Sequence, residues 1–159
     1  MEAGKAFDIR PFGVEAQRLL RLEKGPIIIG QDTDGLTFPA EANMSWAIAG
    51  KKSFHIGKRS TEIQSRREQT RSLVGFTLPA HSTLPREANL TLKGNDIAGR
   101  ITSVAHSTTL NKIIGLTYVL PEQSEVGTSF DIKLSDGSLI SIEVVSLPFY
   151  DHENLRQGM

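Results

Sequence analysis

The 159-residue sequence predicts an α+β protein whose second half is a small antiparallel β-barrel. Three observations predict this fold. Apolar residues recur at helical spacing near the amino terminus, just before a glycine-proline pair. Short strand-forming runs follow one another from about residue 72 onward, separated by Gly, Pro, Asn and Asp. Two of these runs flank Asp136-Gly137, which is a typical two-residue hairpin turn.

The first predicted element is a helix over residues 12–24, FGVEAQRLLRLEK. Gly25 is a good left-handed terminator, and Pro26 cannot continue a helix. Four apolar residues recur at helical spacing and would form one buried stripe: Phe12, Ala16, Leu19 and Leu20.

The next segments predict short elements joined by irregular chain. Residues 26–30, PIIIG, are typical of a short buried strand or an extended segment. Residues 46–50, WAIAG, predict a short strand, and Trp46 is expected in the core. Residues 57–71, GKRSTEIQSRREQTR, are polar enough for a helix on the surface.

The remaining strands predict the barrel. In SFDIKLSDGSLISIEVV the apolar residues alternate with polar ones on both sides of the turn: Phe130, Ile132 and Leu134, then Ile140, Ile142 and Val144. Five or six such strands over about eighty residues favour a compact antiparallel barrel. We therefore divide the chain into residues 1–72 and residues 73–159.

Composition limits the possible functions. Lysine plus arginine equals aspartate plus glutamate at 18 each, so the chain lacks the basic field that sequence-independent nucleic-acid binding needs. It has no cysteine for disulfides, thiolate metal ligands or a thiol nucleophile. It also has no apolar run of membrane-spanning length and no signal-peptide hydrophobic region. We expect a cytoplasmic protein with no membrane or nucleic-acid partner.

Several short patterns imitate functional motifs. DTDG at 32–35 resembles the start of a calcium loop, but the later ligands are absent, and a hydrogen-bonded turn is favoured. GKRS at 57–60 lacks the upstream glycine of a phosphate loop. The four histidines show no ligand spacing. The sequence therefore predicts neither a metal site nor a catalytic residue.

The stretch 51–71 is basic, with two glutamates interleaved. A solvated helix face with local ion pairs is the favoured interpretation. A strip that docks a partner or a polyanion is the alternative.

A longer stretch carries a family resemblance. GVEAQRLLRLEKGPIIIGQDTDGLTFPAEANMSWAIAGKKSFHIGKRS resembles the segment that closes the folate-binding region in the aminomethyltransferase family. That family contains the glycine cleavage T-protein, dimethylglycine and sarcosine dehydrogenases, and the sarcosine oxidase alpha subunit. The elements LRLEKG, GQDTDG and GKRS are most similar to the alpha subunit. The similarity continues in order through GRITSVAHSTTLNKIIGLTYV and VVSLPFYD.

The resemblance implies the end of a folate-binding domain followed by a small antiparallel barrel. It also implies an activity, in which tetrahydrofolate captures a one-carbon unit from an amine-bound methylene or imine and leaves as methylenetetrahydrofolate. For a member of the sarcosine oxidase type, this would accompany oxidative demethylation of sarcosine or a related amine. Flavin and NAD are expected only in other domains or subunits, because no glycine-rich dinucleotide motif occurs here.

The resemblance also implies residues that contact folate. In the family the glutamate of the RLE-G motif holds the pterin, and Glu23 is the matching residue. A carboxylate suits this role because it accepts the ring N–H and the exocyclic amino group side by side. The alternative is a surface glutamate.

Lys52 matches a basic residue that helps to bind folate in the T-protein, although lysine lacks the planar fork of arginine. Tyr150 can contact the ligand or simply close the barrel, and the second role is favoured.

Family members carry a long portion before the stretch that resembles MEAG, and it supplies much of the folate cavity and an assisting aspartate. The resemblance therefore implies that a partner chain or a missing amino-terminal half completes the site, and we expect the isolated chain to be inactive. The alternative function is a non-catalytic assembly or interaction module with a vestigial folate site.

Overall fold

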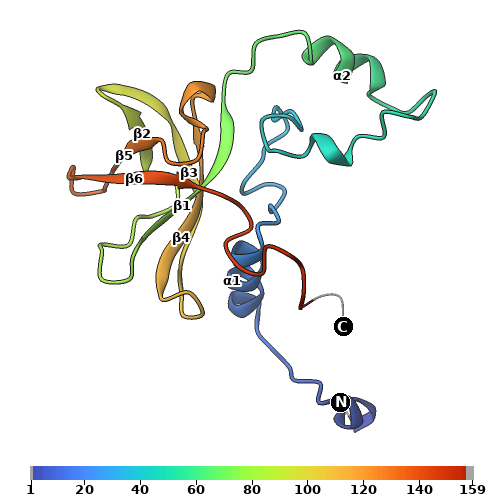
Figure 1. Ribbon diagram of the computed structural model, residues 1–159, viewed down its shortest axis with the longest axis vertical. Coiled ribbons are helices and arrows are strands. Elements are labelled where there is room, and N and C mark those ends of the chain that lie inside the picture. Colours follow the sequence, from blue (N-terminus) through green and yellow to red (C-terminus); the bar gives the residue numbers. More distant parts are fainter. Residues whose placement is uncertain (1, 157–159) are drawn as a thin grey trace.

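A computed structural model describes residues 2–156 and confirms the α+β class (Figure 1). Six antiparallel strands close into a barrel in the order β1-β4-β3-β2-β5-β6. β1 begins at Ser72, and the division of the chain between residues 72 and 73 stays a prediction. The strands are β1 (Ser72–Pro79), β2 (Leu90–Lys93), β3 (Asp96–Ser107), β4 (Lys112–Val119), β5 (Ser129–Lys133) and β6 (Leu139–Val145).

Helices are short and lie mostly before the barrel. The α-helices are α1 (Val14–Lys24) and α2 (Lys58–Gln64), and the 3-10 turns are η1 (Glu2–Phe7), η2 (Ser45–Ala47) and η3 (Pro121–Gln123). Gly25 ends α1 in the left-handed conformation, with φ of 93°, and its N–H donates to the carbonyls of Arg21 and Leu22. This is the terminator predicted from the sequence. Within the described residues, no helix is both long and apolar enough to cross a bilayer.

The predicted hairpin is confirmed, but its turn is longer than the two residues expected. The Leu134 N–H donates to the Ser138 carbonyl oxygen at 2.8 Å, so Ser135, Asp136 and Gly137 form the loop. Gly137 has φ of 87°, and the Ser138 N–H donates to the Asp136 carboxylate at 3.0 Å. The two strands then pair in register, with Ile132 opposite Ile140. The turn therefore fixes which side chains of β5 and β6 point into the barrel.

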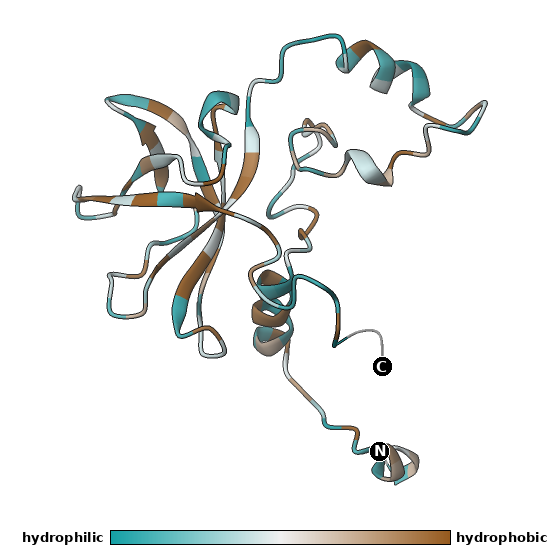
Figure 2. Ribbon diagram, in the orientation of Figure 1, coloured by the Kyte–Doolittle hydropathy of each residue, from teal (hydrophilic) through white to brown (hydrophobic). Residues whose placement is uncertain are grey.

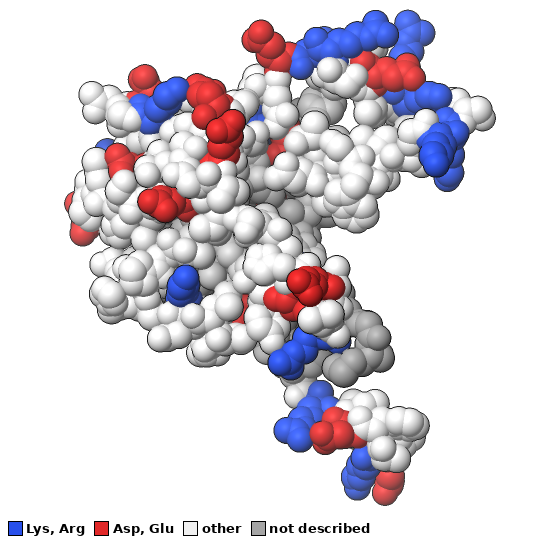
Figure 3. Space-filling view, in the orientation of Figure 1, with Lys and Arg blue, Asp and Glu red and all other residues white. Residues whose placement is uncertain are grey.

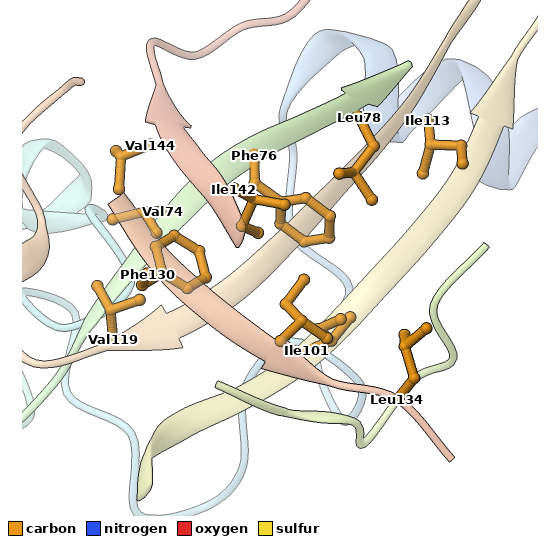
Figure 4. Packing of buried hydrophobic residues seen from close by; sticks show 11 residues of the cluster. Val74, Phe76, Leu78, Ile101, Ile113, Val119, Phe130, Leu134, Ile142 and Val144 are labelled. Carbon is orange, nitrogen blue, oxygen red and sulfur yellow. The ribbon is translucent and has the colours of Figure 1, made fainter. Parts of the chain in front are cut away.

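The barrel interior is filled by aliphatic and aromatic side chains (Figure 4). Phe76 lies at its centre and is completely buried. Figure 2 shows hydrophobic stretches along the strands. Buried residues alternate with more exposed ones along β5 and β6, whereas β1 and β4 are buried on both faces. The buried members of this core are Val74, Phe76, Leu78, Ile101, Ile113, Val119, Phe130, Ile132, Leu134, Ile142 and Val144.

A second apolar cluster lies outside the barrel wall and attaches α1 to it. It joins one residue of α1 and one of the following loop to the outer faces of β1 and β4 and to the carboxyl-terminal tail. Its buried members are Leu22, Ala42, Leu73, Ile114, Leu116, Tyr118 and Phe149. Part of the segment before the barrel thus packs against the outer surface of the barrel.

Two sequence predictions before residue 72 are wrong, and a third loses one of its two alternatives. The stripe expected to be buried on α1 is not, because Phe12 and Leu20 are 66% and 53% exposed, and the helix buries Leu22 and Glu23 instead. For residues 26–30 the buried-strand alternative is wrong, because they form only an isolated bridge, and the extended-segment alternative is the one left. Residues 46–50 form no strand, since the short turn η2 lies there instead.

Trp46, expected in the core, is 78% exposed. The spacing of apolar residues alone did not predict which side chains of this segment would be buried.

Gly115 tests the packing of the barrel. A Cβ at this position would overlap the Phe76 ring and approach the Ser103 carbonyl oxygen to 2.8 Å. We expect Gly115→Ala to lower the free energy of unfolding by about 1–3 kcal/mol in urea titration. Gly35→Ala is the matched control, because no atom lies within 4 Å of its added Cβ. Equal stability of the two variants would contradict this account of the core.

Candidate functional site

Glu23 lies in the last turn of α1 and is buried, with 2% of its surface exposed. Ser107 is the last residue of β3, and its hydroxyl donates to Glu23 Oε1 at 2.6 Å. The Glu23 carbonyl oxygen accepts the Tyr150 N–H at 2.9 Å. The interpretation of Glu23 as a solvated surface residue is therefore wrong. The carboxylate joins α1 to the barrel wall, while its assignment to a pterin stays a prediction.

The carboxyl-terminal tail is tied to the same helix end. Lys24 Nζ lies 2.7 Å from the Asp151 carboxylate and 2.6 Å from the Asp151 carbonyl oxygen. Both side chains are largely buried, at 18% and 8% exposed. The hydrogen bond from Lys24 is the main reason that the pKa of Asp151 lies below its ordinary value. This pair holds the tail, including Tyr150, beside Glu23.

Asp32 is the most heavily hydrogen-bonded carboxylate of the described residues. It is 1% exposed and lies 2.6 Å from Arg21 Nη1. The hydroxyls of Thr102 and Ser103 donate to its Oδ1 at 2.7 and 2.5 Å, and the Ile28 N–H donates to Oδ2 at 2.8 Å. A buried carboxylate is stable only when paired and hydrogen-bonded in this way.

A strand irregularity brings the two hydroxyls to Asp32. The pairing of β3 with β4 shifts register between Ile101 and Ser103. In a regular strand successive side chains point to opposite faces, so Thr102 and Ser103 could not both reach one carboxylate. β4 adds a further contact, because the Tyr118 hydroxyl donates to the Asp32 carbonyl oxygen at 2.9 Å.

The loop after Asp32 forms the hydrogen-bonded turn predicted from DTDG. Asp34 accepts the Leu36 N–H at 2.9 Å and the Thr37 hydroxyl at 2.7 Å. The bond from Thr37 is the main cause that lowers the pKa of Asp34.

Arg71 then ties the loop to the barrel. It lies 3.3 Å from the Glu41 carboxylate and stacks 4.7 Å from the centre of the Tyr118 ring. Burial raises the pKa of Tyr118.

The structure places the three predicted folate contacts in two regions. Glu23 and Tyr150 are adjacent, and Tyr150 is half-buried in the tail. Lys52 is exposed on the segment between η2 and α2, where its carbonyl oxygen accepts a bond from Lys58. The described residues therefore bring two of the three together, and none of the three assignments is tested by this geometry.

A polar cleft of about 130 Å³ lies beside α1 and β3, lined in part by Arg18, Arg21, Gln31, Glu87 and Ser103. Ligand pockets for folate-sized molecules are about 300 Å³ or larger. The cleft is too small to enclose a folate, so this chain does not form a complete folate cavity there.

Sequence reasoning missed the Arg21–Asp32 pair and Ser107. The sequence held only a weak indication of the pair. Asp32 follows the apolar run PIIIG, and Arg21 precedes it by eleven residues. Ser107 gave no signal, because it lies 84 residues from Glu23 in the sequence and meets it only where α1 packs against β3.

Two family models match this chain in order. The model described as "GCVT N-terminal domain" matches residues 1–52, and the one described as "Glycine cleavage T-protein C-terminal barrel domain" matches residues 71–151. The second match spans the six strands of the barrel. The segment that contains α2 lies between the two matches.

Individual proteins are similar over nearly the whole chain. A sarcosine oxidase subunit alpha from Corynebacterium sp. (strain U-96) is 32% identical over 98% of this chain, which spans 17% of that protein. An aminomethyltransferase from Halothermothrix orenii is 36% identical over 94% of this chain, which spans 41% of that protein. The crystal structure of the glycine cleavage system aminomethyltransferase T from Bartonella henselae matches 86% of this chain with a TM-score of 0.78 and 26% identity, over 38% of its own length.

Asp32→Asn tests the buried cluster. The neutral amide removes the counter-ion of Arg21. It also has one acceptor oxygen where the carboxylate has two, so the surrounding donors are not all satisfied. We therefore expect a loss of about 3 kcal/mol in the free energy of unfolding. Asp34→Asn is the matched control, because asparagine supports the same exposed turn, and we expect a loss of less than about 1 kcal/mol. Urea titration compares the two. A loss for Asp32→Asn no larger than that of the control would show that the cluster does not hold α1.

Asp151→Asn tests the tail contact through its pH dependence. The folded pKa of Asp151 lies below its ordinary value of 3.8. The pair therefore adds stability above about pH 4, and that contribution is lost as the pH falls through the folded pKa. We expect the original chain to be more stable than Asp151→Asn in urea at pH 7, with the difference shrinking toward pH 3. A difference that does not change with pH would contradict an ionic contact.

Proposed function

The chain belongs to the glycine cleavage T-protein family, and on this premise we propose that it forms the carboxyl-terminal part of a tetrahydrofolate-dependent aminomethyltransferase unit. More specifically, we place it with the sarcosine oxidase alpha subunits. There it would take part in oxidative demethylation of sarcosine or a related amine. When bound, tetrahydrofolate supplies the acceptor for the one-carbon unit. The proposal retains the cytoplasmic location expected from the sequence.

The order of the two matched domains carries this proposal. The match to the GCVT N-terminal domain precedes the match to the barrel domain, and a sarcosine oxidase alpha subunit is similar across both of them. The structure supports the same reading, because α1 and the barrel are joined by buried polar contacts rather than by a free linker. A barrel retained only as a separate module would not need such contacts to a folate-domain segment.

Within this proposal Glu23 holds the pterin, while Tyr150 packs beside it. Each carboxylate oxygen can accept two hydrogen bonds, so the bond from Ser107 leaves acceptor capacity on Glu23. Its 2% exposure means that the packing around the end of α1 must open for a pterin to reach it. Lys52 would approach the acidic tail of the folate from its exposed segment.

Completion of the cavity requires the rest of the folate-binding domain. This chain spans 41% of the Halothermothrix aminomethyltransferase and 17% of the Corynebacterium alpha subunit. The remaining part would enclose the ligand and exclude water, which the small cleft beside α1 cannot do. In this proposal flavin and NAD belong to other domains or subunits.

The proposal is tested by tetrahydrofolate binding and methylenetetrahydrofolate formation. We expect neither with the isolated chain, and both when the chain is joined to the part of the Halothermothrix aminomethyltransferase that it does not match. We expect Glu23→Gln to weaken tetrahydrofolate binding about tenfold or more in calorimetry, because it replaces one acceptor of a bidentate pair. Glu15→Gln is the control, since Glu15 is an exposed glutamate of the same helix.

The outcomes separate two functions. Equal binding by the two variants would remove the pterin assignment of Glu23 but leave the family function. Absence of tetrahydrofolate binding in the joined protein would favour the alternative, an interaction module with a vestigial site. The bond that Ser107 donates to Glu23 is the observation on the side of this alternative, because it gives the carboxylate an internal partner.

A further inference from the structure

Ser107 lies at the end of β3 and bonds to two other segments at once. Its side chain is completely buried. Its Oγ accepts the Leu110 N–H at 3.0 Å, and its hydroxyl donates to Glu23 Oε1 at 2.6 Å. The first bond belongs to the turn between β3 and β4, which follows the Ser107–Lys112 pair. Ser107 therefore links a tight turn of the barrel to the carboxylate that the proposed function assigns to the pterin.

The turn determines where the hydroxyl proton of Ser107 points. A serine hydroxyl has one proton to donate and two lone pairs that accept. Because the Leu110 N–H occupies one lone pair, the proton must point away from that amide, and among the described residues it meets Glu23 Oε1. At 2.6 Å this bond has the length typical of a hydroxyl that donates to an ionised carboxylate. Ser107 is thus a fixed donor rather than a freely rotating one.

The main chain of Glu23 is held independently of Ser107. The Glu23 carbonyl oxygen accepts the Tyr150 N–H at 2.9 Å. The next residue, Lys24, bonds to the carboxyl-terminal tail as well. These contacts fix the backbone at the end of α1 but do not reach the carboxylate. A glutamate side chain has several rotatable bonds, and ordering them costs free energy. The bond from Ser107 is the contact that selects one orientation of the carboxylate.

Glu23 differs from the buried carboxylate of Asp32. Figure 3 shows several Asp and Glu side chains at the surface of one face of the molecule, where carboxylates ordinarily lie. Asp32 offsets its burial with hydrogen bonds to both of its oxygens. Glu23 is 2% exposed, yet within residues 2–156 its Oε1 accepts one hydrogen bond and its Oε2 accepts none. Such a carboxylate is costly to bury unless further donors reach it.

A purely structural tether is the competing explanation of the bond between Ser107 and Glu23. However, α1 has other attachments to the barrel, because the Asp32 cluster joins it to β3 and Leu22 packs in the second apolar cluster. A tether does not need a carboxylate with a free oxygen, whereas a site for a ligand with N–H donors does. The unused acceptor capacity of Glu23 therefore favours a role toward a ligand.

We propose that Ser107 is a positioning residue for the pterin. It occupies one lone pair of Glu23 Oε1, so that the other lone pair and the free Oε2 face the ring N–H and the exocyclic amino group side by side. This inference rests on the proposed function, because it extends the role given there to Glu23. The ligand class that it specifies is a heterocycle with two adjacent N–H donors. A ligand with a single donor at that edge gains less from Ser107.

Tetrahydrofolate binding tests this role in the protein in which the chain is joined to the unmatched part of the Halothermothrix aminomethyltransferase. We expect Ser107→Ala to weaken binding about tenfold in calorimetry, because the carboxylate loses its fixed orientation. Ser107→Thr keeps the hydroxyl and should bind within about twofold of the unsubstituted protein. In a Glu23→Gln background, where no bidentate pair forms, Ser107→Ala should change the affinity less than about twofold. A full tenfold loss in that background would overturn the proposal.

Ser103→Ala is the matched control. Ser103 is a buried serine of the same strand, and its hydroxyl donates to a different buried carboxylate, that of Asp32. We expect its loss to lower stability in urea titration but to change the affinity for tetrahydrofolate less than about twofold. If Ser103→Ala weakened binding as much as Ser107→Ala, loosening of α1 would explain both effects, and the positioning role would be contradicted.

A second measurement uses a tetrahydrofolate analogue that lacks the exocyclic amino group. We expect the unsubstituted joined protein to prefer tetrahydrofolate about tenfold or more, and Ser107→Ala to lose most of that preference. A structural defect would weaken both ligands equally, and that result would overturn the proposal. Normal tetrahydrofolate binding that Ser107→Ala leaves unchanged would overturn this inference alone. Absence of tetrahydrofolate binding by the unsubstituted joined protein would overturn the proposed function together with it.

Discussion

The burial of the Asp32 carboxylate against Arg21 is the constraint on which the rest of the structure depends. An unpaired carboxylate at 1% exposure would cost several kcal/mol, so the four donors around it must be held together for the chain to fold as it does. Because these donors come from α1, from the chain after it and from β3, satisfying one group fixes three segments. The register shift in β3 exists at the position where two neighbouring hydroxyls must face the same side.

This polar contact explains why the segment before the barrel is not attached uniformly along its length. Residues 14–44 are fixed to the barrel by charge and hydrogen bonds, and the second apolar cluster packs around that attachment. Residues 45–70 contain no buried residue, and Trp46, Phe54 and Ile56 are exposed.

The sequence predicted the barrel well and the segments before it poorly, for a physical reason. In the barrel, alternation along β5 and β6 and the Asp136-Gly137 turn are local signals that the neighbouring strand reinforces. Before residue 72 the apolar pattern was misleading, because Trp46 faces water although its neighbours suggested a strand. Glu23 was selected through the family resemblance, which gave the position but neither its burial nor its bond to Ser107. Long-range polar contacts leave no local pattern, so the Asp32 cluster could not be predicted.

The central claim is that this chain contributes a pterin contact to a folate site completed by other residues. A crystal structure of the joined protein with tetrahydrofolate bound measures this most directly. The account predicts a Glu23 carboxylate oxygen at hydrogen-bond distance, about 2.7–3.0 Å, from the pterin nitrogens, with the end of α1 opened toward the ligand. A pterin held entirely by residues outside this chain, with Glu23 still buried against Ser107, would contradict it.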